Sequence, residues 1–219
     1  MHLAIFDLDH TLLRGDSDKL WGDYLISMHK VDPVIYKQKN DDFFAQYRAG
    51  RLDIHAYLHF ALAPLALYTP EELHTWRKNF TEHWLKPLIY KQAAALVQSY
   101  KDRGYTTMII TATNAFITQP VTELLRVDHL LATRVEMKNN RYTGRYLGTP
   151  TFQHGKVTNL EQWLQQHADH TMEQTLFFSD SHNDLPLMRR VAKAVAVHPD
   201  PQLQQYAQQS RWPIIYFSE

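Results

Sequence analysis

The stretch that most constrains the fold is residues 3–13, LAIFDLDHTLL. Its first four residues, Leu3–Phe6, form an apolar run that is too short for a helix and is typical of a fully buried strand. Asp7 and Asp9 follow where this strand is expected to end. Because burying an unpaired charge is costly, these carboxylates must face a cation, water or each other at the edge of a sheet. Together with Thr11 they can supply a nucleophile, a proton donor and a ligand for a hard metal ion.

Composition excludes several classes of protein. The chain has 219 residues, of which 44% are hydrophobic and 21% charged, as in ordinary soluble globular proteins. Lysine plus arginine equals aspartate plus glutamate, 23 of each, so no net charge favours nucleic acid or an acidic membrane as a partner. The absence of cysteine excludes a disulfide framework and thiolate metal sites and is typical of the cytoplasm, where we expect the protein. We expect neither a signal peptide nor a membrane span.

Residues 15–87 are predicted to be helical. Their apolar side chains recur at helical spacing, and no strand pattern interrupts them. The sequence Thr69-Pro70-Glu71-Glu72 is a typical helix start, because it offers a threonine cap, a proline in the first turn and a glutamate three residues after the cap. The aromatic residues of this segment are therefore expected to form the core of a small helical unit.

From residue 86 onward the pattern alternates between helices and strands. This alternation predicts a mostly parallel sheet covered on both faces, with its active site at the carboxyl ends of the strands. Thr111 and Asp180, like Asp7, follow apolar strands. Asn139 and Asn140 favour a hairpin, since asparagine tolerates positive φ. We expect helices at 93–100, 115–125, 157–167 and from 185, and strands at 106–110, 130–137, 141–146, 175–178, 194–197 and 213–217.

Four motifs, in order, resemble those of the haloacid-dehalogenase-like phosphohydrolases. FDLDHTLL is similar to the family's first motif, D-x-D-x-T-L, and TTMIITAT to the second, with Thr111 as its hydroxyl residue. Lys156 in HGKVTNL matches the third, and Asp180 and Asp184 in FFSDSHNDLPLM match the fourth. Ser179 stands where many relatives carry glycine, a departure expected to alter loop flexibility more than chemistry. The resemblance implies a Rossmann-like three-layer sandwich, with residues 1–14 and 88–219 as the α/β core and 15–87 as an inserted α-helical cap domain.

The resemblance also implies a mechanism. Asp7 would attack phosphorus to form an aspartyl-phosphate, and Asp9 would protonate the leaving alkoxide and later deprotonate water. Thr111 and Lys156 would stabilise the charge of the phosphoryl group.

A divalent metal ion belongs to the same expectation. Oxygen ligands without cysteine favour Mg²⁺. In the family the metal contacts are the carboxylate of Asp7, the backbone carbonyl of Asp9 and the side chain of Asp180. Asp184 would act through water or by orienting Lys156.

Substrate contacts are expected from Thr111, Ala112 and Asn183 within the motifs, and from the cap. In the similar phosphoserine-phosphatase branch, a glutamate nine residues beyond the nucleophile binds the substrate amine. The same count from Asp7 reaches Asp16, whose alternative role is a helix N-cap. Alignment on Gly50-Arg51-Leu52 puts Ala61 where that branch has the arginine that binds the substrate carboxylate.

The predicted substrate is therefore a small phosphorylated metabolite with an amine and no carboxylate. Without the arginine, phosphoserine should bind poorly, and histidinol phosphate is one candidate. Three alternatives stay open: a phosphotransferase to an alcohol acceptor, a phosphoserine phosphatase, and a non-catalytic phosphate-binding module. The sequence leaves both a monomer and a homodimer open.

Overall fold

A computed structural model describes residues 1–218 of the chain, so Glu219, the last residue of the predicted core domain, lies outside the described part. Its strands form one seven-stranded sheet in the order β4-β3-β2-β1-β5-β6-β7. Neighbouring strands run parallel except β3 and β4, which are antiparallel. The predicted α/β fold with a mostly parallel sheet is confirmed. The strands are β1 Leu3–Phe6, β2 Thr106–Asn114, β3 His129–Lys138, β4 Arg141–Leu147, β5 Thr175–Ser179, β6 Lys193–Val197 and β7 Ile214–Ile215.

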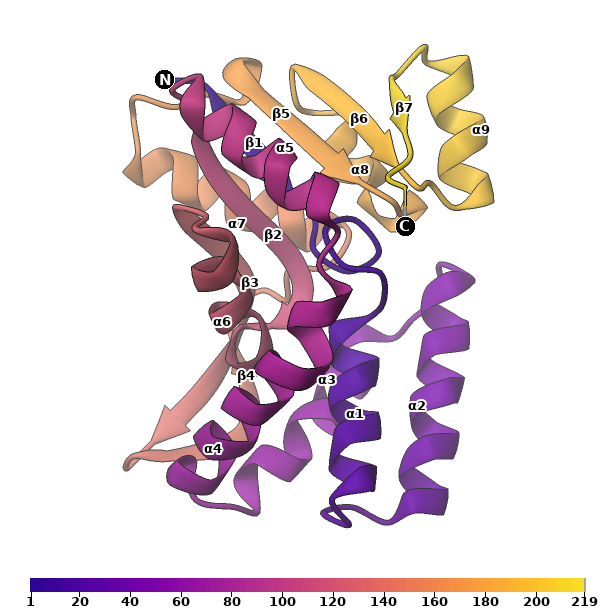
Figure 1. Ribbon diagram of the computed structural model, residues 1–219, viewed down its shortest axis with the longest axis vertical. Coiled ribbons are helices and arrows are strands. Elements are labelled where there is room, and N and C mark those ends of the chain that lie inside the picture. Colours follow the sequence, from indigo (N-terminus) through magenta and orange to yellow (C-terminus); the bar gives the residue numbers. More distant parts are fainter. Residues whose placement is uncertain (219) are drawn as a thin grey trace.

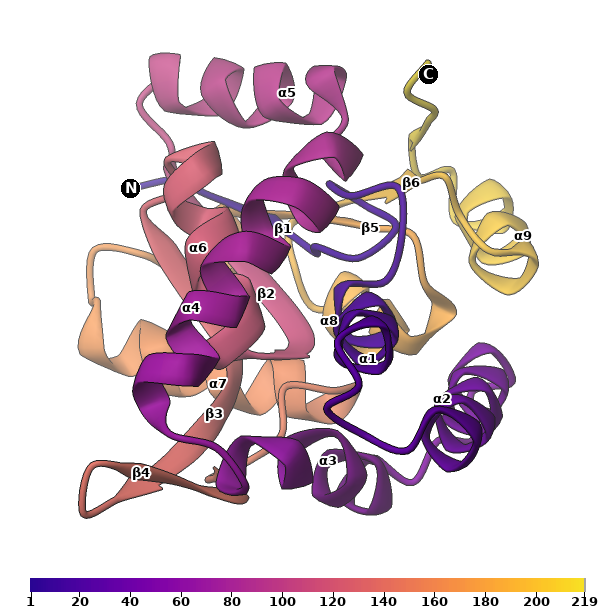
Figure 2. The same cartoon turned by 60° about the horizontal axis from the view of Figure 1, so that its bottom comes forward.

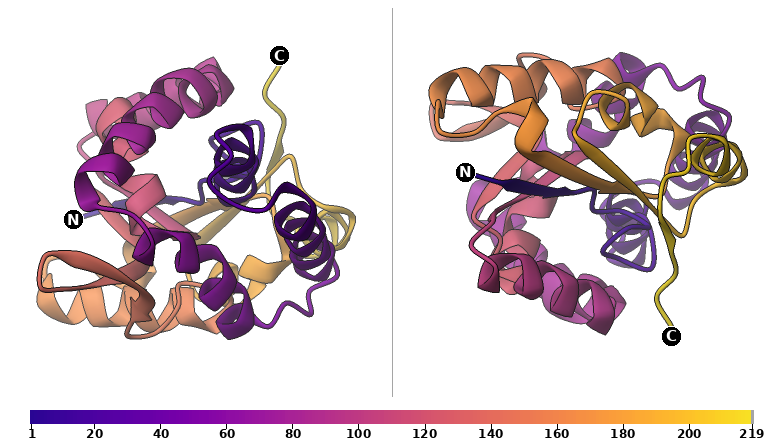
Figure 3. Two further views of the ribbon diagram at one scale, coloured as in Figure 1. Left: turned by 90° about the horizontal axis from the view of Figure 1, so that it is seen from below. Right: turned by 90° about the horizontal axis from the view of Figure 1, so that it is seen from above.

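Strand β1 is the centre of the sheet, paired with β2 on one side and β5 on the other. Its side chains alternate between two buried clusters, with Ala4 and Phe6 in one and Leu3 and Ile5 in the other. Helices α5 and α6 contribute to the first cluster, and α7, α8 and α9 to the second. Figure 3 shows the sheet between these two layers, which makes the predicted three-layer sandwich. The helices are α1 Ser17–Ser27, α2 Pro33–Arg48, α3 Ile54–Leu62, α4 Pro70–Phe80, α5 Lys91–Asp102, α6 Ala115–Leu125, α7 His154–Gln166, α8 Leu185–Met188 and α9 Pro201–Gln209.

The helices α1 to α4 gather beyond the carboxyl ends of the central strands (Figures 1 and 2). The chain enters and leaves this helical segment at adjacent points, since Leu13 pairs with Ile89 in an isolated antiparallel bridge. Trp21 of α1 and Phe80 of α4 belong to the same buried cluster as Phe6 of the sheet. The helices therefore share their hydrophobic core with the sheet, and the division into a core domain and a cap domain stays a prediction.

Local sequence signals account for several boundaries. Thr69 and Glu72 form the expected capping box at the start of α4. Asn139 and Asn140, with φ of 50° and 57°, make the two-residue turn between β3 and β4. Helix α9 was not predicted, because in its glutamine-rich sequence only Leu203 and Ala207 are buried, which is too weak a pattern to recognise. The final strand was predicted over 213–217, but β7 has only two residues.

Pro120 lies inside α6 and connects that helix to α4. Proline has no N–H, so the carbonyl of Phe116, four residues earlier, loses its helical donor. Arg77 of α4 donates to this carbonyl at 3.1 Å, and its guanidinium lies 5.0 Å from the centre of the Phe116 ring. The bond satisfies a backbone oxygen that the sequence of α6 leaves free, and it fastens α4 to the layer of helices on the sheet. No helix within residues 1–218 has both the length and the apolar character needed to cross a membrane.

Candidate active site

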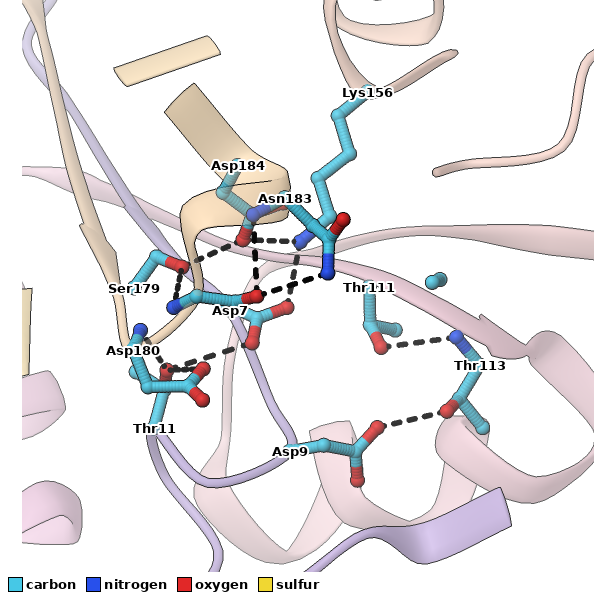
Figure 4. Close-up of polar contacts among 12 residues, drawn as sticks. Asp7, Asp9, Thr11, Thr111, Thr113, Lys156, Ser179, Asp180, Asn183 and Asp184 are labelled. Atoms are coloured by element: carbon cyan, nitrogen blue, oxygen red, sulfur yellow. Dashed lines mark hydrogen bonds and ion pairs between the residues drawn. The ribbon is translucent and has the colours of Figure 1, made fainter. Parts of the chain in front are cut away.

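The carboxyl ends of β1 and β5 and the first turn of α7 bring a lysine and three acids together (Figure 4). Asp7 follows β1, and its backbone N–H donates to the carbonyl of Phe178 in β5 at 2.8 Å. Lys156 Nζ lies 2.7 Å from Asp7 Oδ1 and 2.7 Å from Asp184 Oδ2. All three side chains are buried. Burial by itself lowers the pKa of Lys156, but the carboxylates of Asp184 and Asp7 raise it above its ordinary value, so the ammonium stays charged.

The fourth-motif acids are oriented by hydroxyl groups. Thr11 Oγ1 donates to Asp180 Oδ1 at 3.0 Å, accepts from the backbone N–H of Asp180, and lies 3.4 Å from Asp7 Oδ2. Ser179 Oγ donates to Asp184 Oδ2 at 2.6 Å. The expectation that Ser179 affects mainly loop flexibility is therefore wrong, because its hydroxyl binds the carboxylate that holds Lys156.

These acids carry more negative charge than the one ammonium balances. Burial raises the pKa of Asp7, although Lys156 opposes the effect. Burial also raises the pKa of Asp180 well above its ordinary value, with added repulsion from Asp7 and Asp184, and raises that of Asp184 to about 6. A cation beside Asp7 and Asp180 would relieve this repulsion, and oxygen donors suit a hard ion.

Acidic side chains alone do not complete a metal site. Within residues 1–218, no three histidine or acidic side chains are arranged so that they hold an ion by themselves. Proteins usually hold Mg²⁺ through one or two carboxylates together with water and substrate phosphate, and Asp7 and Asp180 offer two such carboxylates. The donor set therefore fits Mg²⁺ through Asp7, Asp180 and a backbone carbonyl.

The side chain of Asp9 lies away from this group and reaches the start of α1. Its Oδ1 accepts from the backbone N–H of Ser17 at 2.7 Å, and its Oδ2 accepts from Thr113 Oγ1 at 2.7 Å. Burial, followed by the negative charge of Asp16, raises the pKa of Asp9 to about 6. A carboxyl with such a pKa can both give and take a proton near neutral pH.

A cavity extends from Asp7 to the inner faces of α1, α2 and α3. Its walls are acidic and aromatic, and its basic side chains are Lys19 and Lys156; no arginine lines it in the described part of the chain. The acids are Asp7, Asp9, Asp16, Asp18 and Asp184, and the aromatic residues are Phe43, Phe44, Tyr47, Tyr57 and Phe152.

The expected substrate contacts all line this cavity. Thr111 is buried, and its Oγ1 accepts from the backbone N–H of Thr113 at 3.2 Å. Ala112 lies beside it. The amide of Asn183 accepts from Gln153 and donates to the carbonyl of Tyr47, so it connects the fourth motif to α2.

Asp16 and Ala61, the two positions compared with the phosphoserine-phosphatase branch, differ in whether they line the cavity. Asp16 is the N-cap of α1, accepting from the backbone N–H of Lys19 at 2.8 Å, and it also lines the cavity. The alternative N-cap role thus holds together with a place in the wall. Ala61 is buried in α3 and does not line the cavity, to which α3 contributes Ile54 and Tyr57.

Sequence reasoning missed Asp18. It lies in the first turn of α1, 8% exposed, where Oδ1 accepts from Asn114 Nδ2 at 3.1 Å and the carboxyl is hydrogen-bonded to the Tyr57 hydroxyl. Burial, followed by repulsion from Asp16, raises its pKa to about 8. The signal in the sequence that could have indicated Asp18 was the second acid of Asp16-Ser17-Asp18. The same pattern is equally typical of an exposed helix start.

The raised pKa of Asp18 predicts a pH-dependent stability. Between about pH 4 and 8 the folded chain keeps a proton that the unfolded chain has lost, so stability falls as pH rises. The Asp18→Asn variant lacks this group. In urea unfolding with a metal chelator, wild type should lose about 1.4 kcal/mol per pH unit relative to this variant between pH 5 and 7. If the free energy of unfolding changed equally with pH in wild type and Asp18→Asn, the raised pKa of Asp18 would be contradicted.

Comparisons with known proteins agree with the fold and the site described above. Residues 4–189 match the family model described as haloacid dehalogenase-like hydrolase. The chain is 42% identical over 219 residues to a histidinol-phosphatase from Neisseria meningitidis serogroup C, covering 99% of each. It is 26% identical to the phosphoserine phosphatase SerB1 of Mycobacterium tuberculosis, covering 96% of this chain and 69% of the relative.

Solved structures share the fold. A protein of unknown function from Bordetella pertussis Tohama I superposes with a TM-score of 0.90 at 38% identity, covering 97% of both chains. A phosphoserine phosphatase solved as a phospho-aspartyl intermediate analogue gives a TM-score of 0.71 at 18% identity, covering 100% of this chain and 93% of that one. The expected reaction class, hydrolysis of phosphoric monoesters, is confirmed by these relatives. The matched family model, the full-length relative and the motif residues gathered at one sheet edge lead to one conclusion: the chain belongs to the haloacid dehalogenase-like hydrolases.

Proposed function

We propose that this chain hydrolyses histidinol phosphate through an aspartyl-phosphate on Asp7. The observation that carries the proposal is the buried contact of Lys156 with Asp7 and Asp184 at the floor of an acidic, aromatic cavity. The full-length similarity to a histidinol-phosphatase supports the choice of substrate.

In the first step, the Asp7 carboxylate attacks phosphorus and the bond from phosphorus to the substrate oxygen breaks. Asp9 gives its proton to the departing oxygen, so the product leaves as a neutral alcohol. The pKa of about 6 supports Asp9 in this role, and its bonds to Ser17 and Thr113 hold its side chain in place. Lys156 and Thr111 stabilise the negative charge on the phosphoryl oxygens.

In the second step, Asp9 takes a proton from water. The resulting hydroxide oxygen bonds to phosphorus, the acyl-phosphate bond breaks, and Asp7 and inorganic phosphate are released. Asp184 and Ser179 keep Lys156 in place during both steps. Mg²⁺ held by Asp7, Asp180 and the carbonyl of Asp9 supplies additional positive charge at the phosphoryl group when bound.

The cavity favours an amine over a carboxylate. Asp16 in its wall attracts a cationic nitrogen and repels a carboxylate. The cavity also lacks, within the described residues, the arginine that usually binds a carboxylate in a bidentate manner. Phosphoserine is therefore expected to be a poorer substrate than histidinol phosphate.

The test is a comparison of kcat/KM for histidinol phosphate, phosphoserine and p-nitrophenyl phosphate. We expect histidinol phosphate to exceed phosphoserine by roughly 100-fold. Chelation should lower all three activities about 100-fold or more, and Mg²⁺ should restore them, because the metal stabilises the charge of the transition state.

Two results would contradict the proposal. Equal activity on phosphoserine would remove the substrate assignment, and full activity after exhaustive chelation would remove the metal. Addition of a small alcohol to the assay separates hydrolysis from transfer, since a phosphotransferase would yield the phosphorylated alcohol in place of inorganic phosphate.

A further inference from the structure

The mechanism proposed above leaves one buried acid of the cavity unused. Asp18 contacts no group of the phosphoryl site and receives its hydrogen bonds from Asn114 and Tyr57. It faces the part of the cavity that is formed by the helical segment, with Phe43 on α2 and Tyr57 on α3. The residues around Asp18 are therefore expected to contact the part of a substrate that does not react.

No basic side chain within residues 1–218 forms an ion pair with Asp18. Lys19, the adjacent base, instead lies 3.1 Å from Asp23 and 3.6 Å from Asp41. Asp9 and Asp16 add further negative charge near Asp18. A positively charged or N–H-donating group bound here would stabilise the ionised form of Asp18, which burial and these neighbouring acids disfavour in the free protein, so this part of the cavity is complementary to such a ligand.

The walls around Asp18 suit a flat ring. Phe43 and Tyr57 meet edge to face, with ring centroids 5.4 Å apart, and both line the cavity. Aromatic side chains pack well against other aromatic rings, and the Asp18 carboxylate can accept a hydrogen bond from a ring N–H. An acid beside aromatic walls is thus suited to a nitrogen heterocycle.

We propose that Asp18 is a specificity residue that binds a second nitrogen group of the substrate, the imidazole ring of histidinol phosphate, while Asp16 binds its amine. This inference rests on the proposed function. It predicts that a change at Asp18 lowers the hydrolysis of a substrate with the imidazole ring more than that of phosphomonoesters without it.

The test compares Asp18→Asn with wild type on three phosphomonoesters. Histidinol phosphate has an amine and an imidazole, phosphoethanolamine has the amine alone, and p-nitrophenyl phosphate has neither. Asparagine keeps the size of the side chain and an oxygen that can accept from Asn114. We expect kcat/KM for histidinol phosphate to fall roughly 10- to 100-fold, mainly through KM, with changes of about twofold on the other two.

The matched control is Asp42→Asn, which removes an exposed carboxylate of α2 outside this cavity and should change none of the three activities. Tyr57→Phe, which keeps the ring and removes only the hydroxyl that bonds to Asp18, should give the same selectivity with a smaller loss. This second variant decides the question if Asp18→Asn does not fold.

A binding measurement separates this inference from the proposed function. Calorimetric titration with histidinol, which lacks phosphate, should show binding to wild type and at least about tenfold weaker binding to Asp18→Asn. Selective loss in both assays supports the role of Asp18. Hydrolysis of histidinol phosphate by wild type combined with equal losses on all three substrates, or with unchanged histidinol affinity, overturns the role and leaves the proposed function standing. Histidinol binding that depends on Asp18, without hydrolysis of histidinol phosphate, overturns the proposed function alone. Absence of histidinol binding to wild type overturns the inference.

Discussion

Asp7→Asn should lower kcat for histidinol phosphate by roughly 10⁴-fold or more and leave no phosphate attached to the protein. The amide oxygen carries no negative charge and is a poor nucleophile, so the first step of the proposed mechanism is lost. Lys156 keeps Asp184 as a charged partner, and the fold should therefore survive. Rapid quenching with labelled substrate, followed by mass analysis of the protein, measures both quantities.

The control for Asp7→Asn is again Asp42→Asn, whose phosphoenzyme level should equal that of wild type. Thermal unfolding of both variants shows whether any loss of activity comes from loss of structure. Labelled phosphate on the Asp7→Asn protein, or on Asp9 in wild type, would show that another residue is the nucleophile.

Asp9→Asn should give a burst of nitrophenol followed by a steady rate that is about 10²- to 10⁴-fold below that of wild type. Nitrophenolate leaves readily without a proton, so Asp7 can still be phosphorylated. Hydrolysis of the acyl-phosphate needs a base to activate water, and asparagine is not one. The second step then becomes rate-limiting, and phosphate should accumulate on Asp7.

The geometry makes Asp9→Asn a clean substitution. Asparagine can still accept from the backbone N–H of Ser17, and Thr113 can accept from its amide where it donated to the carboxylate. The natural substrate, whose alkoxide leaves poorly, should show no burst, because it needs the proton in the first step as well. A burst of equal size with both substrates would contradict proton donation by Asp9.

The sequence was sufficient to predict the mostly parallel sheet and to place polar side chains at the carboxyl ends of its central strands. Asp7 and Asp180 follow apolar strands, whereas Thr111 lies within β2, which runs to Asn114 and not to residue 110 as predicted. The carboxyl ends of neighbouring parallel strands necessarily meet at one edge. The contact of Asp7 with Lys156 follows from the position of Lys156 in the first turn of α7. The individual roles assigned to these residues, and to Asp9, Asp184, Ala112 and Asn183, stay predictions.

The contacts that could not be predicted from the sequence depend on tertiary packing, above all on how the helices pack against each other. The spacing of α1 shows a helix but not that Asp18 is buried against Tyr57 and Asn114, since these partners come from α3 and the start of α6. Ser179 could not be assigned to Asp184, because a hydroxyl and a glycine are both compatible with the same strand end. The bond between Arg77 and α6 likewise depends on a tertiary contact.

The position of β1 also determines when the enzyme can become complete during synthesis. The strand that precedes Asp7 is synthesised before both of its neighbours in the sheet, β2 and β5. Its second partner begins at Thr175, so about 170 residues must be added before β1 is paired on both sides. At roughly 5–20 residues per second this takes about 10–30 s. Until β5 has emerged, one edge of β1 lacks its partner and Asp7 lacks its backbone bond to Phe178, so the site can form only after that point of synthesis.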